Sequence, residues 1–171
     1  MTRKDELEAK VSLEKLDELV EDILTNGVAG GDPNFRSIVF SGLSKTKNPI
    51  LLYKMEKTLF DKKAKDLKKT IIVGIFLQQE FFQPILEYGE FMLSNCGNLD
   101  VNCEHSESLL LVIDTLLVLN DRGRLAEFDT AFEMLLILEG MSNESTVLGS
   151  KIRQRIQHID MNALKKKYEK F

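Results

Sequence analysis

The sequence contains very little of several residue types. The chain of 171 residues has no tryptophan, two cysteines and three prolines. Two cysteines are too few for a disulfide framework, and proline and glycine are too scarce for a collagen-like or low-complexity chain. Hydrophobic residues make up 43% of the chain, which is too much for a disordered protein. What remains is an ordinary globular protein, for which one domain is the default at this length.

Long apolar runs are also missing. The longest one covers residues 70–77 and ends at Gln78, whereas a membrane span needs about 20 apolar residues. The first residues carry charges of both signs, and no apolar segment typical of a signal peptide follows them. We therefore expect a protein without a membrane span that is cytoplasmic or nuclear and not secreted.

The formal net charge of -4 conceals four blocks of alternating sign. Residues 1–32 carry 4 basic and 9 acidic side chains, whereas residues 33–70 carry 10 basic and 3 acidic ones. Residues 71–147 carry 2 basic and 13 acidic side chains, and residues 148–171 carry 7 basic and 2 acidic ones. Either oppositely charged helices lie side by side in one molecule, or a basic face meets an acidic partner.

Apolar residues recur at helical spacing in the first half of the chain. Asn26-Gly27 is expected to end the first helix, and residues 35–40 are expected to form a short one. Asn48-Pro49 is a good helix start, because asparagine caps a helix and proline suits its first turn. The apolar face of that helix moves near Asp61, so the helix either rotates its buried face or breaks there.

The second half follows the same pattern. Residues 70–77 are rich in β-branched residues but lack turn signals, so they are interpreted as a buried helix. Residues 106–120 and 124–139 are expected to form two helices joined by a tight turn at 121–123, and therefore an antiparallel hairpin. Another amphipathic helix follows, and Asp160 can cap a short basic helix at the C-terminus. The predicted fold class is all-α: a compact bundle or short helical solenoid of about eight helices, mostly antiparallel neighbours.

Two observations bear on how this fold is organised. Residues 1–30 form an acidic amphipathic helix and a glycine-rich loop, and they are a candidate oligomerisation arm. Residues 31–171 are predicted to form a single helical domain, and a subdivision of this domain near 96–105 is an open alternative. Residues 123–138 resemble the second helix of a tetratricopeptide repeat. Phe128 and Leu135 stand where that repeat needs small residues. The resemblance nevertheless keeps a short helical solenoid among the architectures that the sequence allows.

Few residues form a pattern that could support catalysis or bind a metal. Cys96, Cys103 and His105 fall in one polar connection, and thiolate and imidazole are the ligands that zinc prefers. Their spacing matches no usual zinc site and a fourth ligand is missing, so we expect reduced cysteines, no metal and no cofactor. The motifs of a phosphate-binding loop, a nucleophile elbow and a dinucleotide site all fail, which predicts a protein that is not an enzyme and has no small-molecule substrate.

The lysine-rich segment 54–69 is the strongest candidate for binding. If residues 49–69 form one continuous helix, four of its lysines lie within about 80° of one another and face solvent. Such a stripe could contact phosphates or an acidic partner, although Asp61 interrupts it and the pI is about 5.3. The residues predicted for this role are Lys54, Lys57, Lys62, Lys63, Lys65, Lys68, Lys69, Arg153 and Arg155.

Two apolar groups are candidates for protein contacts. Aromatic residues cluster in the middle of the chain, which predicts either core packing or a hydrophobic interaction surface formed by Phe81, Phe82, Tyr88 and Phe91. The first helix could clasp a second copy through Leu13, Leu16, Val20 and Ile23. The predicted function is therefore a non-catalytic, helical protein–protein interaction or regulatory protein that can form a homodimer. The alternative is an RNA- or DNA-binding protein that uses the lysine-rich helix.

Overall fold

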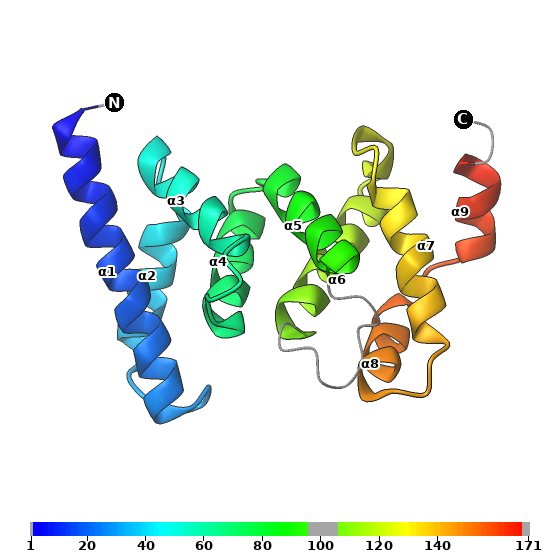
Figure 1. Ribbon diagram of the computed structural model, residues 1–171, viewed down its shortest axis with the longest axis horizontal. Helices are drawn as coiled ribbons and strands as arrows, with labels where there is room; N and C mark the ends of the chain where they lie inside the picture. The colour runs from blue at the N-terminus through cyan, green and yellow to red at the C-terminus, as the bar shows by residue number, and fades with distance from the viewer. Residues whose placement is uncertain (1, 96–105, 169–171) are drawn as a thin grey trace. The chain divides into compact units, whose positions relative to one another are not determined.

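The computed structural model describes residues 2–95 and 106–168, and the chain divides into two compact units, Met1–Pro84 and Ile85–Phe171. Across the described residues there are nine α-helices, one short 3-10 helix and no strand (Figure 1). The prediction of an all-α protein of about eight packed helices is confirmed. No helix within those residues is long and apolar enough to cross a membrane.

The first unit is built from four helices, and side-chain caps set the starts of the first three. The four helices are α1 (Arg3–Asn26), α2 (Pro33–Ser44), α3 (Pro49–Leu59) and α4 (Asp66–Gln78). Thr2 and Asp5 form a capping box at α1, and Asp32 accepts a hydrogen bond from the first turn of α2. Gly27 ends α1 with a φ of 78°, as the sequence predicted.

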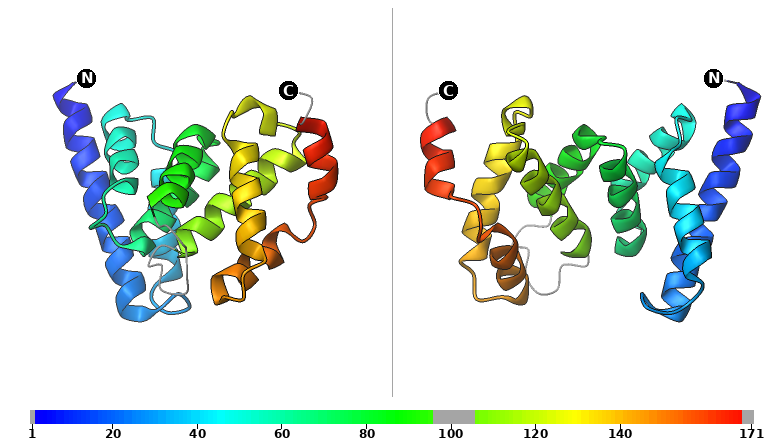
Figure 2. Two further views of the ribbon diagram at one scale, coloured as in Figure 1. Left: turned by 45° about the vertical axis from the view of Figure 1, so that its right-hand side comes forward. Right: turned by 180° about the vertical axis from the view of Figure 1, so that it is seen from behind.

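The core of the first unit gathers on α1. Helix α1 packs against α2, α3 and α4, and α2 and α3 each pack against α4. Figure 1 and the right-hand view of Figure 2 show α1 and α2 lying side by side. Fully buried side chains come from α1, α3 and α4, and they include Ala9, Leu16, Leu51, Met55, Leu59, Ile72 and Ile75.

The lysine-rich segment is not one continuous helix. Helix α3 ends at Leu59, and α4 begins only at Asp66. Asp61 explains the break, because its carboxylate accepts a hydrogen bond from the backbone N–H of Lys63 at 2.9 Å, an interaction that competes with helical pairing. Of the two alternatives that the sequence left open, the break near Asp61 is correct.

The second unit contains the remaining helices. Helix α5 (Phe82–Asn95) enters it from the first unit, and four helices follow: α6 (Ser106–Asp121), α7 (Ala131–Ser142), α8 (Val147–Ile156) and α9 (Met161–Tyr168). Thr146 caps α8, and Asp160 accepts a hydrogen bond from the backbone of Ala163 in the first turn of α9, as predicted. Helix α8 packs against both α6 and α7, and this contact buries Leu148, Ile152 and Ile156.

One helix prediction was wrong at both ends. Residues 124–139 were expected to form a single helix that stops at Gly140. Instead, a short 3-10 helix, η1 (Leu125–Glu127), comes first, and α7 then runs through Gly140 to Ser142. Phe128 adopts an extended conformation that ends η1, so the connection between α6 and α7 is longer than the predicted turn.

The charge blocks pair with their neighbours inside each unit. In the first unit Lys68 of the basic block lies 2.8 Å from Asp17 of the acidic block. In the second unit Arg155 lies 3.1 Å from Asp114, and Lys165 lies 2.8 Å from Glu139. The alternating signs along the sequence therefore bring oppositely charged helices together within each unit.

Candidate functional site

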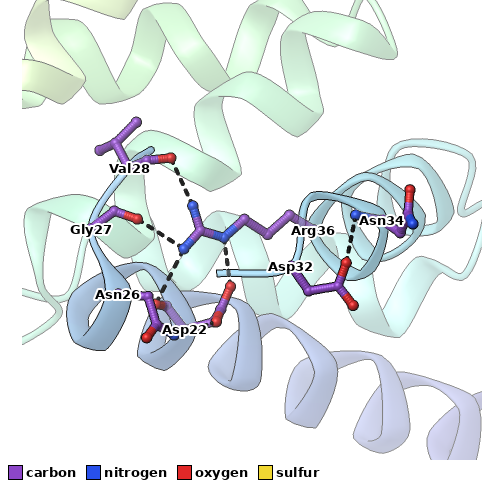
Figure 3. Close-up of polar contacts among 7 residues, drawn as sticks. All are labelled: Asp22, Asn26, Gly27, Val28, Asp32, Asn34 and Arg36. Carbon is purple, nitrogen blue, oxygen red and sulfur yellow. Dashed lines mark hydrogen bonds and ion pairs between the residues drawn. The ribbon is translucent and has the colours of Figure 1, made fainter. Parts of the chain in front are cut away.

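The contact between α1 and α2 is held by a polar clamp centred on Arg36 (Figure 3). Its guanidinium donates hydrogen bonds to the Asp22 carboxylate and, at 2.8 Å each, to the carbonyls of Gly27 and Val28. The hydrogen bond from Arg36 lowers the pKa of Asp22 below its ordinary value, and a second one from Asn26 adds to this. The clamp fixes the angle at which α2 leaves the end of α1.

Beside this clamp lies an apolar groove between α1 and α2. Its volume is about 370 Å³, and its walls are formed by Ser12, Lys15, Phe35, Ile38, Val39, Gly42 and Leu43. A second hollow of about 410 Å³ shares Ser12 and extends the surface to Leu7 and Val11, which are 63% and 47% exposed. The first unit therefore presents an apolar surface where its first two helices meet.

Ile38 and Gly42 give this surface a projection and a hollow. Ile38 is 72% exposed, although isoleucine is among the residues most often buried. Gly42 follows it by four residues, so both lie on one face of α2. A Cβ atom added to Gly42 would meet no atom within 4 Å, which leaves open space directly above the backbone.

The predicted lysine stripe is divided by the break between α3 and α4. Lys54 and Lys57 lie on α3, where Lys57 sits 5.7 Å from the centre of the Tyr53 ring. Lys62, Lys63 and Lys65 are exposed in the segment between the helices. Among the described residues these five lysines have no ion-pair partner, so they form an exposed basic region around the break.

Two hollows adjoin this basic region, and acidic side chains line both of them. Their volumes are about 330 and 620 Å³, and they share Asp17, Thr58, Asp61 and Lys68. Lys68 is paired with Asp17, which ties α4 to α1 and reduces the charge that Lys68 offers to a ligand. The region is basic at its rim and mixed in charge inside.

Three of the predicted basic residues are buried or contact other parts of the same unit. Lys69 is 2% exposed and belongs to the interior, so it does not extend the exposed region. Arg153 donates a hydrogen bond at 2.8 Å to the carbonyl of Ser142 and holds α8 to the end of α7. Arg155 forms the ion pair with Asp114. Both arginines therefore contribute to the packing of the second unit.

The four aromatic residues predicted to form an interaction surface differ in how much of each is exposed. Phe82 and Tyr88 are buried, and Phe91 is half-buried. The Tyr88 hydroxyl lies 2.7 Å from the Ser108 hydroxyl in the second unit. Phe81 is the member that stays well exposed, at 42%, and its ring meets the Phe76 ring edge to face.

Of the four residues on α1 that were predicted to contact a second copy, two are buried within the first unit. Leu16 and Val20 are buried in the first unit, whereas Leu13 and Ile23 are half-buried. Cys96, Cys103 and His105 lie outside the described residues, so the prediction made for them stays a prediction.

The α1–α2 groove was missed by the sequence reasoning. The helix over 35–40 was predicted, but its faces were not assigned. The signal was present: Ile38 and Gly42 are four residues apart and lie on a helix face next to the one that carries Val39 and Leu43, which are buried.

Comparison of the chain with protein-family models, with curated proteins and with solved structures gave no match.

Proposed function

We propose that the protein is a non-catalytic helical interaction protein that pairs with a second copy of itself through the Ile38–Gly42 face of α2. The observation that carries this proposal is the exposed isoleucine one helical turn from an open glycine. If two α2 helices cross antiparallel about a two-fold axis, Ile38 of each copy meets Gly42 of the other. Such a self-complementary patch is what a symmetric dimer requires.

The surroundings of this face suit a helix–helix interface. Glycine allows two helix backbones to approach closely, and burying an exposed isoleucine contributes about 1.5–3 kcal/mol. Phe35 lies one helical turn before Val39 and lines the same groove. Leu7 and Val11 extend the apolar surface along α1. Because the Arg36 clamp fixes α1 and α2, this surface is ordered before a partner arrives, which lowers the entropy lost on binding.

Light scattering over a range of protein concentrations tests the proposal. We expect wild-type protein to shift from monomer to dimer, and Ile38→Glu to raise the dissociation constant at least about a hundredfold, because each dimer loses two apolar contacts and gains two charges. The matched control is Ile137→Glu, which introduces the same change at an isoleucine that is 50% exposed on α7 of the second unit. A wild-type monomer at every concentration would overturn the proposal.

Gly42→Ala separates loss of binding from loss of folding. Its methyl group meets no atom in one chain, so it should raise the free energy of unfolding of the monomer by about 0.5–1 kcal/mol. In a dimer the same methyl group would stand where Ile38 of the second copy packs. We therefore expect a more stable monomer and a weaker dimer. A variant that dimerises as well as wild type would show that this glycine is not at the interface.

The five exposed lysines favour nucleic-acid binding as a second candidate. Lys54, Lys57, Lys62, Lys63 and Lys65 stand close together without ion-pair partners among the described residues. Binding to generic RNA and DNA oligonucleotides, measured across salt concentrations, should then weaken steeply as salt rises. Lys62→Glu combined with Lys63→Glu should remove most of this binding, whereas Lys166→Glu in α9 should not. If neither nucleic acid binds at low salt, this candidate fails.

A further inference from the structure

The peptide bond between Asn26 and Gly27 lies within the polar clamp centred on Arg36 (Figure 3). Asn26 is the last residue of α1, and of the nine asparagines in the sequence it is the one that glycine follows. An asparagine amide can react with the backbone nitrogen of the next residue, and glycine has no side chain to hinder this approach. Asn26 and Gly27 are both exposed, so water reaches the bond.

Deamidation at this bond needs only water as a second reactant. The backbone nitrogen of Gly27 attacks the side-chain carbon Cγ of Asn26, and the bond from Cγ to Nδ2 breaks. The proton of the Gly27 N–H leaves with Nδ2 as ammonia, and a cyclic succinimide remains. Attack of water on Cγ then gives aspartate in a normal backbone. Attack of water on the backbone carbonyl carbon of Asn26 gives isoaspartate, in which the main chain runs through the former side chain.

Two hydrogen bonds at the end of α1 oppose the first step. The N–H of Gly27 donates to the carbonyl of Ile23 at 2.8 Å, and Nδ2 of Asn26 donates to the Asp22 carboxylate at 2.8 Å. Both hydrogen bonds must break before the backbone nitrogen and Cγ can meet. The reaction therefore proceeds from molecules in which this last turn has opened, and its rate follows the population of those molecules.

The Arg36 clamp holds the same turn closed. Its guanidinium donates to the Asp22 carboxylate, which precedes the reactive bond, and to the carbonyls of Gly27 and Val28, which follow it. Figure 3 shows the guanidinium between these acceptors, with Asn26 beside Asp22. Opening the turn separates the two groups of acceptors, so it also breaks hydrogen bonds from Arg36. The clamp therefore lowers the population from which deamidation starts.

The two products weaken the clamp in different ways. Isoaspartate inserts a carbon atom into the main chain between Asp22 and the carbonyls of Gly27 and Val28, so one rigid guanidinium no longer reaches all of these acceptors. Aspartate replaces the amide donor by a second carboxylate one helical turn after Asp22, at the negative end of the helix dipole. Either product loosens the connection between α1 and α2.

We propose that Asn26–Gly27 is a site of spontaneous deamidation, which the Arg36 clamp restrains and whose products release the clamp. Ammonia is lost in the first step, so the change is not reversed, and the modified fraction grows with the age of the protein. Because the connection between α1 and α2 orders the Ile38–Gly42 face, deamidation also reduces the order of the surface proposed for dimerisation.

Peptide mass spectrometry of the full chain, incubated at physiological temperature and mildly alkaline pH, measures the reaction. Conversion of the amide to a carboxyl group raises the mass of the peptide that contains Asn26, and fragmentation separates aspartate from isoaspartate. We expect slow conversion in wild type, and conversion at least about tenfold faster in Arg36→Ala and in wild type unfolded with guanidinium chloride. Asn143 is an internal control, because it is exposed at the end of α7 but glutamate follows it.

Three further variants locate the effect. Arg36→Lys keeps the charge but loses the forked donors, so it should accelerate conversion less than Arg36→Ala does, and it decides the question if Arg36→Ala does not fold. Arg124→Ala removes an arginine–carboxylate pair from the second unit and should leave the rate at Asn26 unchanged. Asn26→Asp reproduces one product and should have a lower urea midpoint than wild type.

Three outcomes would overturn the proposal. The first is a folded wild-type chain that is never converted at Asn26. The second is a wild-type rate in Arg36→Lys and in folded Arg36→Ala, which would show that the clamp does not restrain the reaction. The third is isoaspartate-containing protein with an unchanged urea midpoint, which would show that the product does not release the clamp. Deamidation is measured on single chains, so a monomeric wild type would overturn the proposed dimer and leave this result unaffected.

Discussion

Arg36 and Asp22 form an ion pair that joins the first turn of α2 to the last turns of α1, with side chains that keep only 15% and 18% of their exposure. The same guanidinium donates hydrogen bonds to the backbone carbonyls of Gly27 and Val28, which directly follow α1. Gly31 is part of this arrangement, since a Cβ atom there would stand 2.7 Å from the Arg36 guanidinium. The connection between the two helices is therefore shaped around one arginine.

The pair makes the stability of the first unit depend on pH in a defined window. The pKa of Asp22 is lowered from its ordinary value of 3.8, so its charge stabilises the fold fully above that value. The contribution is lost as the pH falls through the lowered pKa. The urea midpoint of Asp22→Asn should therefore lie below that of wild type at neutral pH and approach it below a pH of about 4. Glu18→Gln, at an exposed residue of the same helix, is the matched control and should leave the urea midpoint close to that of wild type at neutral pH.

Two glycines of the second unit should respond to alanine in opposite directions. In α5, a Cβ atom on Gly89 would stand 2.6 Å from Cγ1 of Val112 and 2.5 Å from Cε of Met134. Gly140 in α7 has nothing within 4 Å of the same position. We expect Gly89→Ala to lower the free energy of unfolding by about 1–3 kcal/mol, and Gly140→Ala to raise it by about 0.5–1 kcal/mol. Denaturant unfolding measures both, and equal effects would contradict the close packing of α5 at Gly89.

The sequence predicted the fold class because the residues that begin or end most helices are recognisable in the sequence itself. Asn48 before Pro49, Gly27 after Asn26 and Asp160 before the last helix each act through their nearest backbone neighbours, so local reasoning was sufficient. The failure over residues 124–130 has the opposite cause. Leu125 is buried at 2% exposure, and the tertiary contacts that bury it favour a 3-10 turn over the regular helix that apolar spacing suggested.

Tyr88 and Ser108 provide a buried hydrogen bond whose strength can be measured. Their hydroxyl oxygens lie 2.7 Å apart, and both residues are 0% exposed. Tyr88→Phe leaves the Ser108 hydroxyl without this partner, and it should lower the free energy of unfolding by about 1–2 kcal/mol. The double variant Tyr88→Phe/Ser108→Ala should lose less than the sum of the two single changes, because either single change already removes the hydrogen bond between the hydroxyls. Strict additivity in the double-mutant cycle would show that the two hydroxyls do not interact.

The candidate surfaces were harder to predict than the fold, because they depend on what other elements leave uncovered. Apolar residues recur at helical spacing along the whole sequence, and Ile38 does not differ from the others in this pattern. Only the packing of α2 on α1 and α4 shows that Ile38 stays outside the core. The lysines were predicted as a group, but the Asp61 turn decided how they are arranged.

Asn48 links two helices of the first unit, and its two roles can be separated by two substitutions. Its Oδ1 accepts hydrogen bonds from the backbone of Ile50 and Leu51 and caps α3, while its Nδ2 donates to the carbonyl of Asp5 in α1 at 2.8 Å. Asn48→Asp keeps the cap but loses the donor, whereas Asn48→Ala loses both. We expect the free energy of unfolding to fall by about 1 kcal/mol for aspartate and by about 2 kcal/mol for alanine. Equal losses in thermal or denaturant unfolding would show that the contact with α1 contributes nothing beyond the cap.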